Sequence, residues 1–456
     1  MNILILGAGE VGFYIAQRLA TEGNDVVVVD NDAERLQRVA DTMDVKTVLG
    51  QASHPSVLRQ AGAENAELLI AATTNDETNM LACQVAHSLF KVTTKMARVR
   101  EPDYVNSTGL FGRDELPIDL IISPEKEAAN SIVKRFQVSS AVDAQDFADG
   151  RVQLLGLRVP PKGILAGLAL NELDEMMGSI RTKIVAHEHN RKWHVPKADT
   201  VLLAGDSVYI AMAKEQVDEF LEHVGHETSE QKNRNVMMVG GGNVGFIVAQ
   251  QLEQMGVSIK LIEHNPVRSQ WLAQQLDSSV VIQGDALDRD LLEEEAIDKM
   301  DDFLALTNDD ETNILVSLIA QKYDVPHVVT LVNRAIYTDL VRQIGLDITV
   351  FPRFTTASSI LRHVRKGRIL GMSPLGDGTL EVLEAVALET SNILNTPLND
   401  LALPANTVIG AIVRNDKVII PDGTTMIEAD DHVLLVTQGT SLRAVEKLFE
   451  VHLEFF

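Results

Sequence analysis

Two glycine-rich segments have the spacing that a chain needs to hold a phosphate group. Gly7–Gly12 and Gly240–Gly245 both follow the pattern GxGxxG, each after a short apolar run and at the start of an amphipathic stretch. The first glycine permits a tight turn, the second lets the backbone approach a pyrophosphate, and the third lets helix and strand pack closely. The N-terminus of that helix then faces the phosphates. The motif therefore predicts two dinucleotide-binding sites.

An acidic residue follows each glycine motif at the spacing that ribose recognition requires. Asp30 lies 18 residues after Gly12, and Glu263 lies 18 residues after Gly245. A carboxylate at this place accepts hydrogen bonds from the ribose hydroxyls of the adenosine half, and it repels a 2′-phosphate. The two acids therefore favour NAD(H) over NADP(H). The alternative is a Rossmann-like lobe that has kept its glycines without a ligand.

Few residues are placed for catalysis around these motifs. No lysine, cysteine or serine stands in a nucleophile pattern, and the histidine cluster is His187 and His189 with His194 nearby. On a strand, His187 and His189 would share a face and could hold a metal ion. We favour an exposed hairpin edge instead, because the later repeat has no matching histidines. We therefore predict no catalytic residue, no metal site and no enzyme; the alternative function is an NAD-dependent oxidoreductase of unknown substrate.

The chain is a tandem repeat in which two kinds of lobe alternate. The matching segments are 3–13 with 236–246, 74–79 with 307–313, and 195–208 with 420–433. The first two matches belong to a lobe that carries the glycine motif. The third belongs to a smaller lobe that follows it, and it aligns Asp206 with Asp431. The order is therefore large lobe, small lobe, large lobe, small lobe.

The hydrophobic pattern predicts the fold of each lobe. In the first large lobe, Val11, Ile15 and Leu19 recur at helical spacing between the β-branched apolar runs 2–6 and 25–29. Buried strands alternating with helices are typical of a parallel sheet covered on both faces. We predict an α/β fold with two Rossmann-like, doubly wound parallel-sheet lobes, each followed by a small α+β lobe. The expected boundaries are 1–138, 139–225, a polar linker at 226–234, 235–366 and 367–456.

Composition limits the partners. The 456 residues carry a net charge of −25, from 40 basic and 65 acidic residues, so the surface repels a phosphate backbone and nucleic acid is not an expected partner. A redox-sensing repressor is disfavoured for the same reason. Cys83 is the only cysteine, which excludes an intramolecular disulfide and fits a reducing cytoplasm. The uncharged stretch 235–252 is rich in glycine and amides, so we expect no transmembrane segment.

The residues also carry a family resemblance. ILGAGEVG at Ile5–Gly12, Asp30, ATTNDETNMLAC at Ala72–Cys83 and the appended β-rich lobe resemble RCK (also called KTN) domains, which regulate potassium channels and transporters. The resemblance covers the chain as two complete RCK units. It implies a peripheral cytoplasmic regulator on the inner face of the cell membrane. There, a homotetrameric gating ring would dock beneath a membrane potassium-transporting subunit.

The resemblance further implies ligand-biased gating by NAD(H), with ATP and ADP as additional candidate ligands. Some RCK domains that prefer ATP have an arginine inside the glycine loop, where this chain has Glu10 and Asn243, so ATP is disfavoured at these loops. Strand-end residues complete the predicted sites, because ligands lie at the carboxyl edge of a parallel sheet; an arginine there is as readily a solvated surface charge. The predicted nucleotide contacts are Gly7, Ala8, Gly9, Glu10, Val11, Gly12, Asp30, Thr73, Thr74 and Arg98, then Gly240, Gly241, Gly242, Asn243, Val244, Gly245, Glu263, Thr307 and Asn308.

Overall fold

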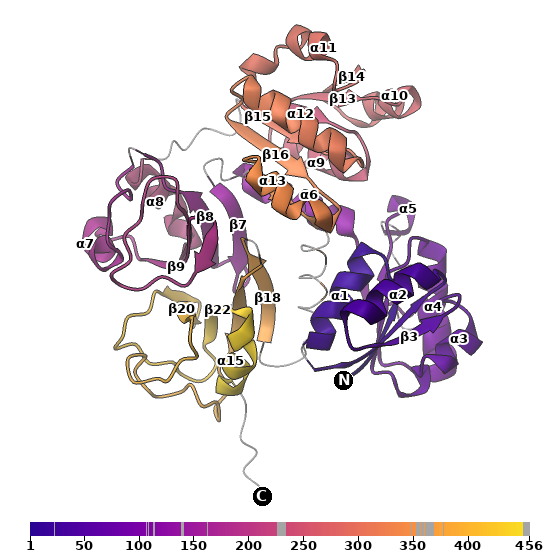
Figure 1. The fold of residues 1–456 in the computed structure, drawn as a ribbon, viewed down its shortest axis with the longest axis horizontal. Coiled ribbons are helices and arrows are strands. Elements are labelled where there is room, and N and C mark those ends of the chain that lie inside the picture. The colour runs from indigo at the N-terminus through magenta and orange to yellow at the C-terminus, as the bar shows by residue number, and fades with distance from the viewer. Residues whose placement is uncertain are drawn as a thin grey trace, which may run out of the picture. The chain divides into compact units, whose positions relative to one another are not determined.

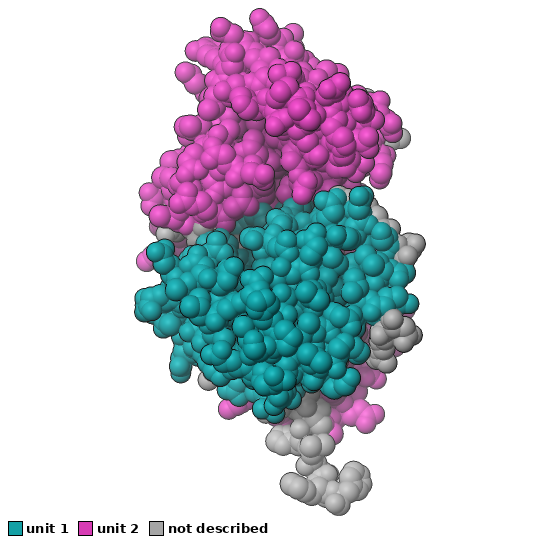
Figure 2. All heavy atoms as spheres, turned by 90° about the vertical axis from the view of Figure 1, so that its right-hand side faces the viewer, with its two compact units in different colours: residues 1–128, 351–360 teal, residues 129–350, 361–456 magenta. Residues whose placement is uncertain are grey.

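The structure is a computed structural model, shown as a ribbon in Figure 1. It describes residues 1–21, 23–105, 107, 109–112, 115–137, 141–161, 163–225, 234–346, 348–352, 356, 360, 369–376 and 378–449. The chain forms two compact units, one of residues 1–128 with 351–360 and one of residues 129–350 with 361–456 (Figure 2). A short segment from the end of the second large lobe therefore belongs to the same unit as the first large lobe.

The first unit contains a six-stranded parallel sheet in the order β3-β2-β1-β4-β5-β6. Its inner strands are apolar on both faces, and all four residues of β4 are buried, which is why helices must cover both sides. The strand order reverses direction between β1 and β4, the place where open sheets of this type bind ligands. The elements are β1 Asn2–Leu6, α1 Glu10–Thr21, β2 Asp25–Asp30, α2 Ala33–Thr42, β3 Lys46–Leu49, α3 Pro55–Gln60, η1 Ala63–Asn65, β4 Leu68–Ala71, α4 Asp76–Val85, η2 Ala86–Phe90, β5 Thr94–Arg98, α5 Pro102–Val105, β6 Leu120–Ile122 and the start of α6 Pro124–Gln137, which continues into the second unit from residue 129.

The second unit repeats this sheet with the order β14-β13-β12-β15-β16-β17. The pairing register repeats as well: Leu6 of β1 pairs with Ala71, and Val239 of β12 pairs with Ala305. The predicted pair of Rossmann-like lobes is therefore confirmed. The elements are β12 Asn235–Val239, α9 Asn243–Gln254, β13 Ser258–Glu263, α10 Pro266–Gln275, β14 Val280–Gln283, α11 Arg289–Glu294, η6 Ile297–Lys299, β15 Asp302–Ala305, α12 Asp310–Lys322, β16 His327–Leu331, η7 Ala335–Tyr337, α13 Thr338–Gln343 and β17 Ile348–Val350.

Both small lobes also lie in the second unit, and each is a five-stranded antiparallel sheet with short helices. The first has the order β10-β9-β11-β8-β7, and the second has the equivalent order β21-β20-β22-β19-β18, so the small α+β lobe is confirmed twice. The first contains β7 Ala141–Phe147, β8 Val152–Arg158, η3 Leu170–Glu172, α7 Leu173–Met177, β9 Thr182–His189, β10 Lys192–His194, β11 Ser207–Ala213, η4 Lys214–Gln216 and α8 Val217–His223. The second contains β18 Ile369–Leu375, β19 Leu380–Val386, β20 Thr407–Arg414, β21 Lys417–Ile419, β22 His432–Gln438, η8 Gly439–Ser441 and α15 Leu442–Leu448.

The two small lobes lie side by side in the ribbon (Figure 1). One apolar core draws residues from both of their sheets. Their backbones approach closely at Gly410, where a Cβ atom would lie 2.8 Å from Val185 Cγ1 and 3.2 Å from Ala211 Cβ. An ion pair of 2.7 Å between Arg151 and Asp416 lies at the same contact. A glycine at Gly410 therefore permits the sheets to meet.

The last part of α6 packs on the second large lobe. Arg234, just before β12, is buried; it donates to Phe136 O at 3.0 Å and lies 4.2 Å from the centre of the Phe136 ring. Gln251 of α9 donates to Asn130 Oδ1 at 3.0 Å. The predicted polar linker included Arg234, whose burial is a correction, because its charge is paired with Asp302 inside the lobe. The rest of that linker, 226–233, lies outside the described residues.

Candidate functional site

In the first glycine loop, close packing within the protein requires two of the three glycines, and the third has open space beside it. Gly7 has a φ of +106°, and a Cβ there would lie 2.8 Å from Ala72 O. A Cβ at Gly12 would lie 1.9 Å from Gly7 O, so the start of α1 could not approach β1. At Gly9, by contrast, a Cβ would meet nothing within 4 Å. The protein itself does not need a glycine at Gly9, whereas a pyrophosphate that approaches the backbone does.

The second glycine loop has the same geometry. Gly240 has a φ of +96°, and a Cβ there would lie 2.7 Å from Thr307 N. A Cβ at Gly245 would lie 2.0 Å from Gly240 O. At Gly242 a Cβ would have only the side-chain amide of Asn308 for a neighbour, at 4.0 Å. Both copies therefore keep an open glycine at the N-terminus of a 12-residue helix, whose free N–H groups attract an anion.

The predicted ribose acids lie beside these loops and hold them in place. Asp30, buried at the end of β2, accepts hydrogen bonds from Ala8 N at 2.5 Å and from Asp32 N at 2.9 Å. Glu263 likewise accepts from Gly241 N at 2.7 Å and from Asn265 N at 2.8 Å. An ionised carboxylate has about four acceptor positions, so each acid retains capacity for ribose hydroxyls.

The predicted strand-end residues are positioned by asparagines that the motif analysis overlooked. Asn79, fully buried, accepts from Thr73 N at 3.0 Å and from Thr73 Oγ1 at 2.6 Å, and it donates to Arg98 O at 2.9 Å. Asn313 repeats this pattern with Thr307 in the second copy. Each asparagine ties the ends of two neighbouring strands together. Thr74 and Asn308 lie exposed at the same edge.

A buried aspartate fixes the next loop in each copy. Asp76 begins α4, but its carboxylate accepts from Arg100 N at 2.7 Å and from Glu101 N at 2.8 Å, beyond the end of β5. Asp310 accepts from Arg334 N at 2.8 Å in the second copy. The polar segment that follows β4, and its repeat after β15, therefore links the end of its own strand to the end of the neighbouring strand. The repeat itself was the signal that could have revealed this role.

The two copies differ in the charges around the loop. Glu10 pairs with Arg38 at 3.0 Å, and the Arg38 guanidinium lies 4.3 Å from the centre of the Phe13 ring. Asn243 of the second copy is exposed. The Glu10 carboxylate thus has a cation beside it, which weakens its repulsion of a phosphate.

Arg98 does not project into open space. It forms an ion pair of 3.2 Å with Glu125, and both side chains are largely buried. Arg98 Nε and Glu125 Oε2 are buried without a hydrogen-bond partner. The second copy has the buried Val332 at the equivalent position. The expected contact of Arg98 with adenine or phosphate stays a prediction, and it requires this ion pair to rearrange.

Arg268 lies beside the second glycine loop and is not among the contacts predicted from the sequence. It donates from Nε to Gly241 O at 2.7 Å, and its guanidinium lies 4.0 Å from the centre of the Trp271 ring. Partial burial lowers the pKa of Arg268, and the nearby Glu263 opposes that shift. The Arg268 guanidinium stacked on Trp271 thus places a positive charge and an aromatic ring next to Glu263.

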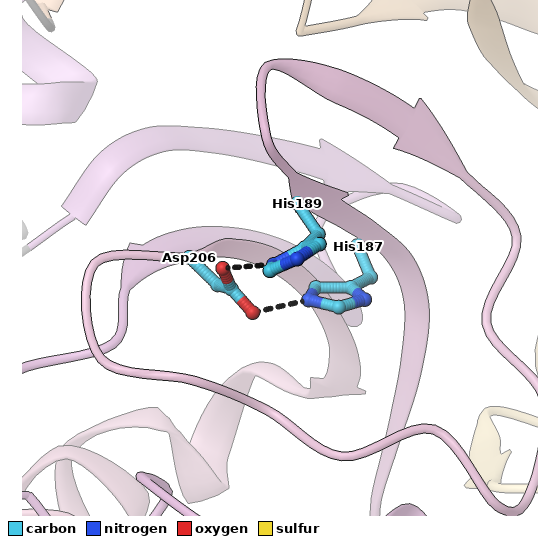
Figure 3. A group of neighbouring side chains, drawn as sticks. All are labelled: His187, His189 and Asp206. Atoms are coloured by element: carbon cyan, nitrogen blue, oxygen red, sulfur yellow. Dashed lines mark hydrogen bonds and ion pairs between the residues drawn. The ribbon is translucent and has the colours of Figure 1, made fainter.

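The histidine cluster is more buried than expected. His187 is only 3% exposed, which corrects the interpretation of an exposed hairpin edge, although β10 does form the edge of its sheet. His187 and His189 both contact the carboxylate of Asp206, at 2.7 and 2.9 Å (Figure 3). Burial lowers the pKa of His187, and the contact with Asp206 opposes this effect. Burial alone would raise the pKa of Asp206, but hydrogen bonds from His187 and His189 lower it.

Cys83 is placed for packing. It is fully buried on α4, and burial raises the pKa of its thiol to about 12. A thiol that stays protonated at neutral pH is a poor nucleophile.

In the described part of the chain, no helix combines the length and the apolar character that crossing a membrane requires.

Comparisons with known proteins agree with the repeat. The TrkA-N domain model matches residues 3–124 and 236–352, and the TrkA-C domain model matches residues 154–225 and 382–450. Among solved structures, the chain is similar to the GsuK RCK domain, with a TM-score of 0.60 at 19% identity over 98% of this chain and 94% of that one. The structure described as the GsuK channel bound to NAD also has a TM-score of 0.60 at 19% identity, over 98% of this chain and 78% of that chain. These two likenesses establish the shared fold.

Curated relatives align from end to end. The Trk system potassium uptake proteins TrkA of Halomonas elongata and of Azorhizobium caulinodans are each 41% identical to this chain and are covered completely, as is the chain itself. The protein of the same name from Vibrio alginolyticus is 39% identical over 99% of both chains. With relatives this similar over the whole length and both domain models matched twice, the chain belongs to the family of the Trk system potassium uptake protein TrkA.

Proposed function

We propose that this chain is a nucleotide-responsive regulatory subunit of a Trk-type membrane potassium uptake system. The names of its full-length relatives support the role in potassium ion transport. The observation that carries the nucleotide response is the open glycine, Gly9 or Gly242, at the start of a helix in each copy. The lobe boundaries expected from the repeat are part of this proposal.

NAD(H) is the ligand that best suits the carboxyl edges of the two parallel sheets. In each copy an open glycine lies next to a carboxylate, Asp30 or Glu263, that still has free acceptor positions. This combination accommodates a pyrophosphate and the ribose beside it. The GsuK structure with a bound NAD supports a nucleotide for this fold in general terms only. ATP and ADP share the adenosine half and are secondary candidates, since neither loop has an arginine for a terminal phosphate.

We propose that ligand binding changes the arrangement of the lobes and that no reaction follows. The described residues around the glycine loops include no acid–base pair placed for hydride transfer. The alternative is an NAD-dependent oxidoreductase. Incubation with NADH and a panel of keto acids, aldehydes and imines distinguishes the two, because steady protein-dependent oxidation of NADH with any of them would contradict the regulatory role.

The proposal includes the cellular location of the protein and its oligomeric state. Its resemblance to RCK domains implies a peripheral subunit on the cytoplasmic face of the membrane, and two RCK units per chain suggest a homotetramer. Light scattering across the micromolar range should report four chains, and a strict monomer would contradict the ring. Co-purification with the potassium-transporting subunit of the same organism tests the partner directly.

The deciding experiment blocks the two open glycines. Gly9→Val and Gly242→Val place a side chain where the protein has no atoms within 4 Å apart from the Asn308 amide at 4.0 Å, so the fold should tolerate them. Calorimetric titration with NADH, NAD⁺, ATP and ADP should show binding to the wild type and a loss of at least about a hundredfold in the double variant. The thermal unfolding midpoint controls for folding. Unchanged NADH affinity in a folded double variant would remove the nucleotide sites from these loops.

A further inference from the structure

The histidine cluster of the first small lobe brings three metal-ligating groups together. His187 and His189 come from one face of β9, and Asp206 comes from the turn that precedes β11 (Figure 3). His187 Nε2 lies 2.7 Å from Asp206 Oδ2, and His189 Nδ1 lies 2.9 Å from Asp206 Oδ1. All three ligand atoms lie within 4.8 Å of one another. His187 and Asp206 are 3% and 7% exposed, while the His189 side chain is 39% exposed and leaves a way in.

The hydrogen bonds around His187 are compatible with a metal ion at its Nε2 atom. His187 Nδ1 lies 3.1 Å from His194 Nε2, and His194 Nδ1 lies 3.3 Å from Lys192 O. In the tautomer with the His194 proton on Nδ1, His194 Nε2 accepts from His187 Nδ1. His187 Nε2 then has a lone pair that faces the Asp206 carboxylate at 2.7 Å, where a cation would bind.

The second small lobe shows what occupies the equivalent place. The strand registers align His187 with Ile412 and His189 with Arg414, and Asp206 corresponds to the fully buried Asp431. Leu203 N donates to Asp206 at 2.9 Å, as Glu428 N does to Asp431 at 2.8 Å. In that lobe the carboxylate is neutralised by Arg414, whose Nε and Nη2 donate to it at 2.8 and 2.7 Å. The first lobe has the same buried acid, with His189 at the position of Arg414.

We propose that His187 Nε2, His189 Nδ1 and the Asp206 carboxylate bind one divalent transition-metal ion of the zinc class. Imidazole and carboxylate ligands suit zinc, cobalt and nickel, whereas calcium and magnesium require mostly oxygen ligands. Tetrahedral zinc with bonds of about 2.0–2.1 Å separates its ligand atoms by about 3.3 Å. The contacts of 2.7 and 2.9 Å with Asp206 would therefore have to lengthen by about half an ångström. Solvent would complete the fourth position.

His194 is the positioning residue of this metal site. A metal-bound histidine usually donates its other ring N–H to a fixed acceptor, which orients the ring. His187 Nδ1 has such an acceptor in His194 Nε2 at 3.1 Å. The site lies in a small lobe and shares no residue with either glycine loop, so it is independent of the nucleotide proposal. It makes the first small lobe a sensor or a structural centre for a metal ion, a property that the second small lobe lacks.

The test uses full-length protein without a histidine tag, stripped of metal with a chelator. Zinc titration by calorimetry should give one ion per chain, and cobalt should produce visible absorption bands typical of a tetrahedral site. Calcium and magnesium should give neither. The matched variant His187→Ile with His189→Arg copies the second lobe, so it should fold and lose zinc affinity at least about a hundredfold. His54→Ala removes an exposed histidine elsewhere and should leave zinc binding unchanged.

Each outcome decides the proposal. Stoichiometric zinc binding that the paired variant abolishes, and that His194→Ala weakens about tenfold or more, supports it. Three results overturn it: no zinc binding by the wild type, equal binding by the paired variant, or a thermal unfolding midpoint that responds to pH but not to zinc. The last result would assign the place between His187 and Asp206 to a proton. An unchanged thermal unfolding midpoint of the metal-free paired variant shows that the variant is folded.

Discussion

In the second glycine loop, the side chain of Leu272 fills the space that a side chain at Gly241 would need. A Cβ there would lie 2.1 Å from Leu272 Cδ1, a contact that no side chain can accept without movement. The first copy has Ala8 and Val39 at the equivalent positions, so a larger loop residue accompanies a smaller helix residue. The second copy thus has the smaller loop residue with the larger helix residue, and the first copy has the reverse.

This exchange makes a stability prediction. Gly241→Ala should cost about 1–3 kcal/mol through overpacking, and adding Leu272→Val should recover most of it because the pair then matches the first copy. Thermal unfolding of both variants measures the effect. Gly242→Ala is the control, because its Cβ meets only the Asn308 amide at 4.0 Å and should be nearly neutral. Additive losses in the double variant would show that the two side chains do not compete for the same space.

The ribose acids predict discrimination between the dinucleotides. A 2′-phosphate beside Asp30 or Glu263 brings like charges within a few ångströms, and repulsion at a protein surface then weakens NADPH relative to NADH by about tenfold or more. Calorimetry with both cofactors checks the ratio. Asp30→Asn with Glu263→Gln keeps an amide oxygen as an acceptor and removes the charge, so the ratio should shrink. Equal affinities in the wild type would separate these acids from the ribose.

Among the elements, the polar connections between strand ends shape the candidate site. Asn79 joins β4 to β5 through Thr73 and Arg98 O, and Asn313 joins β15 to β16 in the same way. Without these bonds, buried backbone groups at the sheet edge would have no partner.

Asn79→Ala should therefore destabilise the first large lobe by about 2–4 kcal/mol, because Thr73 N–H and Arg98 C=O lose their partner. It should also weaken nucleotide binding there, since the strand ends would no longer be held at one edge. The neighbouring Asn75 caps α4 by accepting from Thr78 N at 2.6 Å and is exposed. Asn75→Ala should cost only about 1 kcal/mol. Thermal unfolding compares the two, and similar losses would contradict a special role for Asn79.

Much of this organisation could be predicted from the sequence, because it depends on local patterns. Apolar runs alternating with amphipathic helices specify parallel sheets, and the glycine motifs specify the turn at β1–α1 and β12–α9. The roles of Asn79, Asp76 and Arg268 depend on which strand end or loop lies next to them in space. The burial of His187 could not be predicted for the same reason, because its partner Asp206 comes from a turn 19 residues further along the chain.

For the whole molecule, duplication gives two candidate sites with unequal surroundings. The first loop has Glu10 beside Arg38, and the second has the neutral Asn243 with Arg268 close to its backbone. Calorimetry should resolve two binding events per chain, with the second copy several-fold tighter for ligands of higher phosphate charge. Gly9→Val and Gly242→Val, each alone, assign the events. If either single change abolished all binding, the two lobes would share one site.

The shared core of the two small lobes has a consequence for how the chain can change over time. Because one polypeptide supplies both sides of this contact, each side meets the other at an effective concentration in the millimolar range, whatever the amount of protein in the cell. Such a contact forms even when it is weak. Identical subunits related by symmetry must use the same residue on both sides, whereas fused copies can diverge one position at a time. The two small lobes do differ at equivalent positions, with Arg414 in one and His189 in the other.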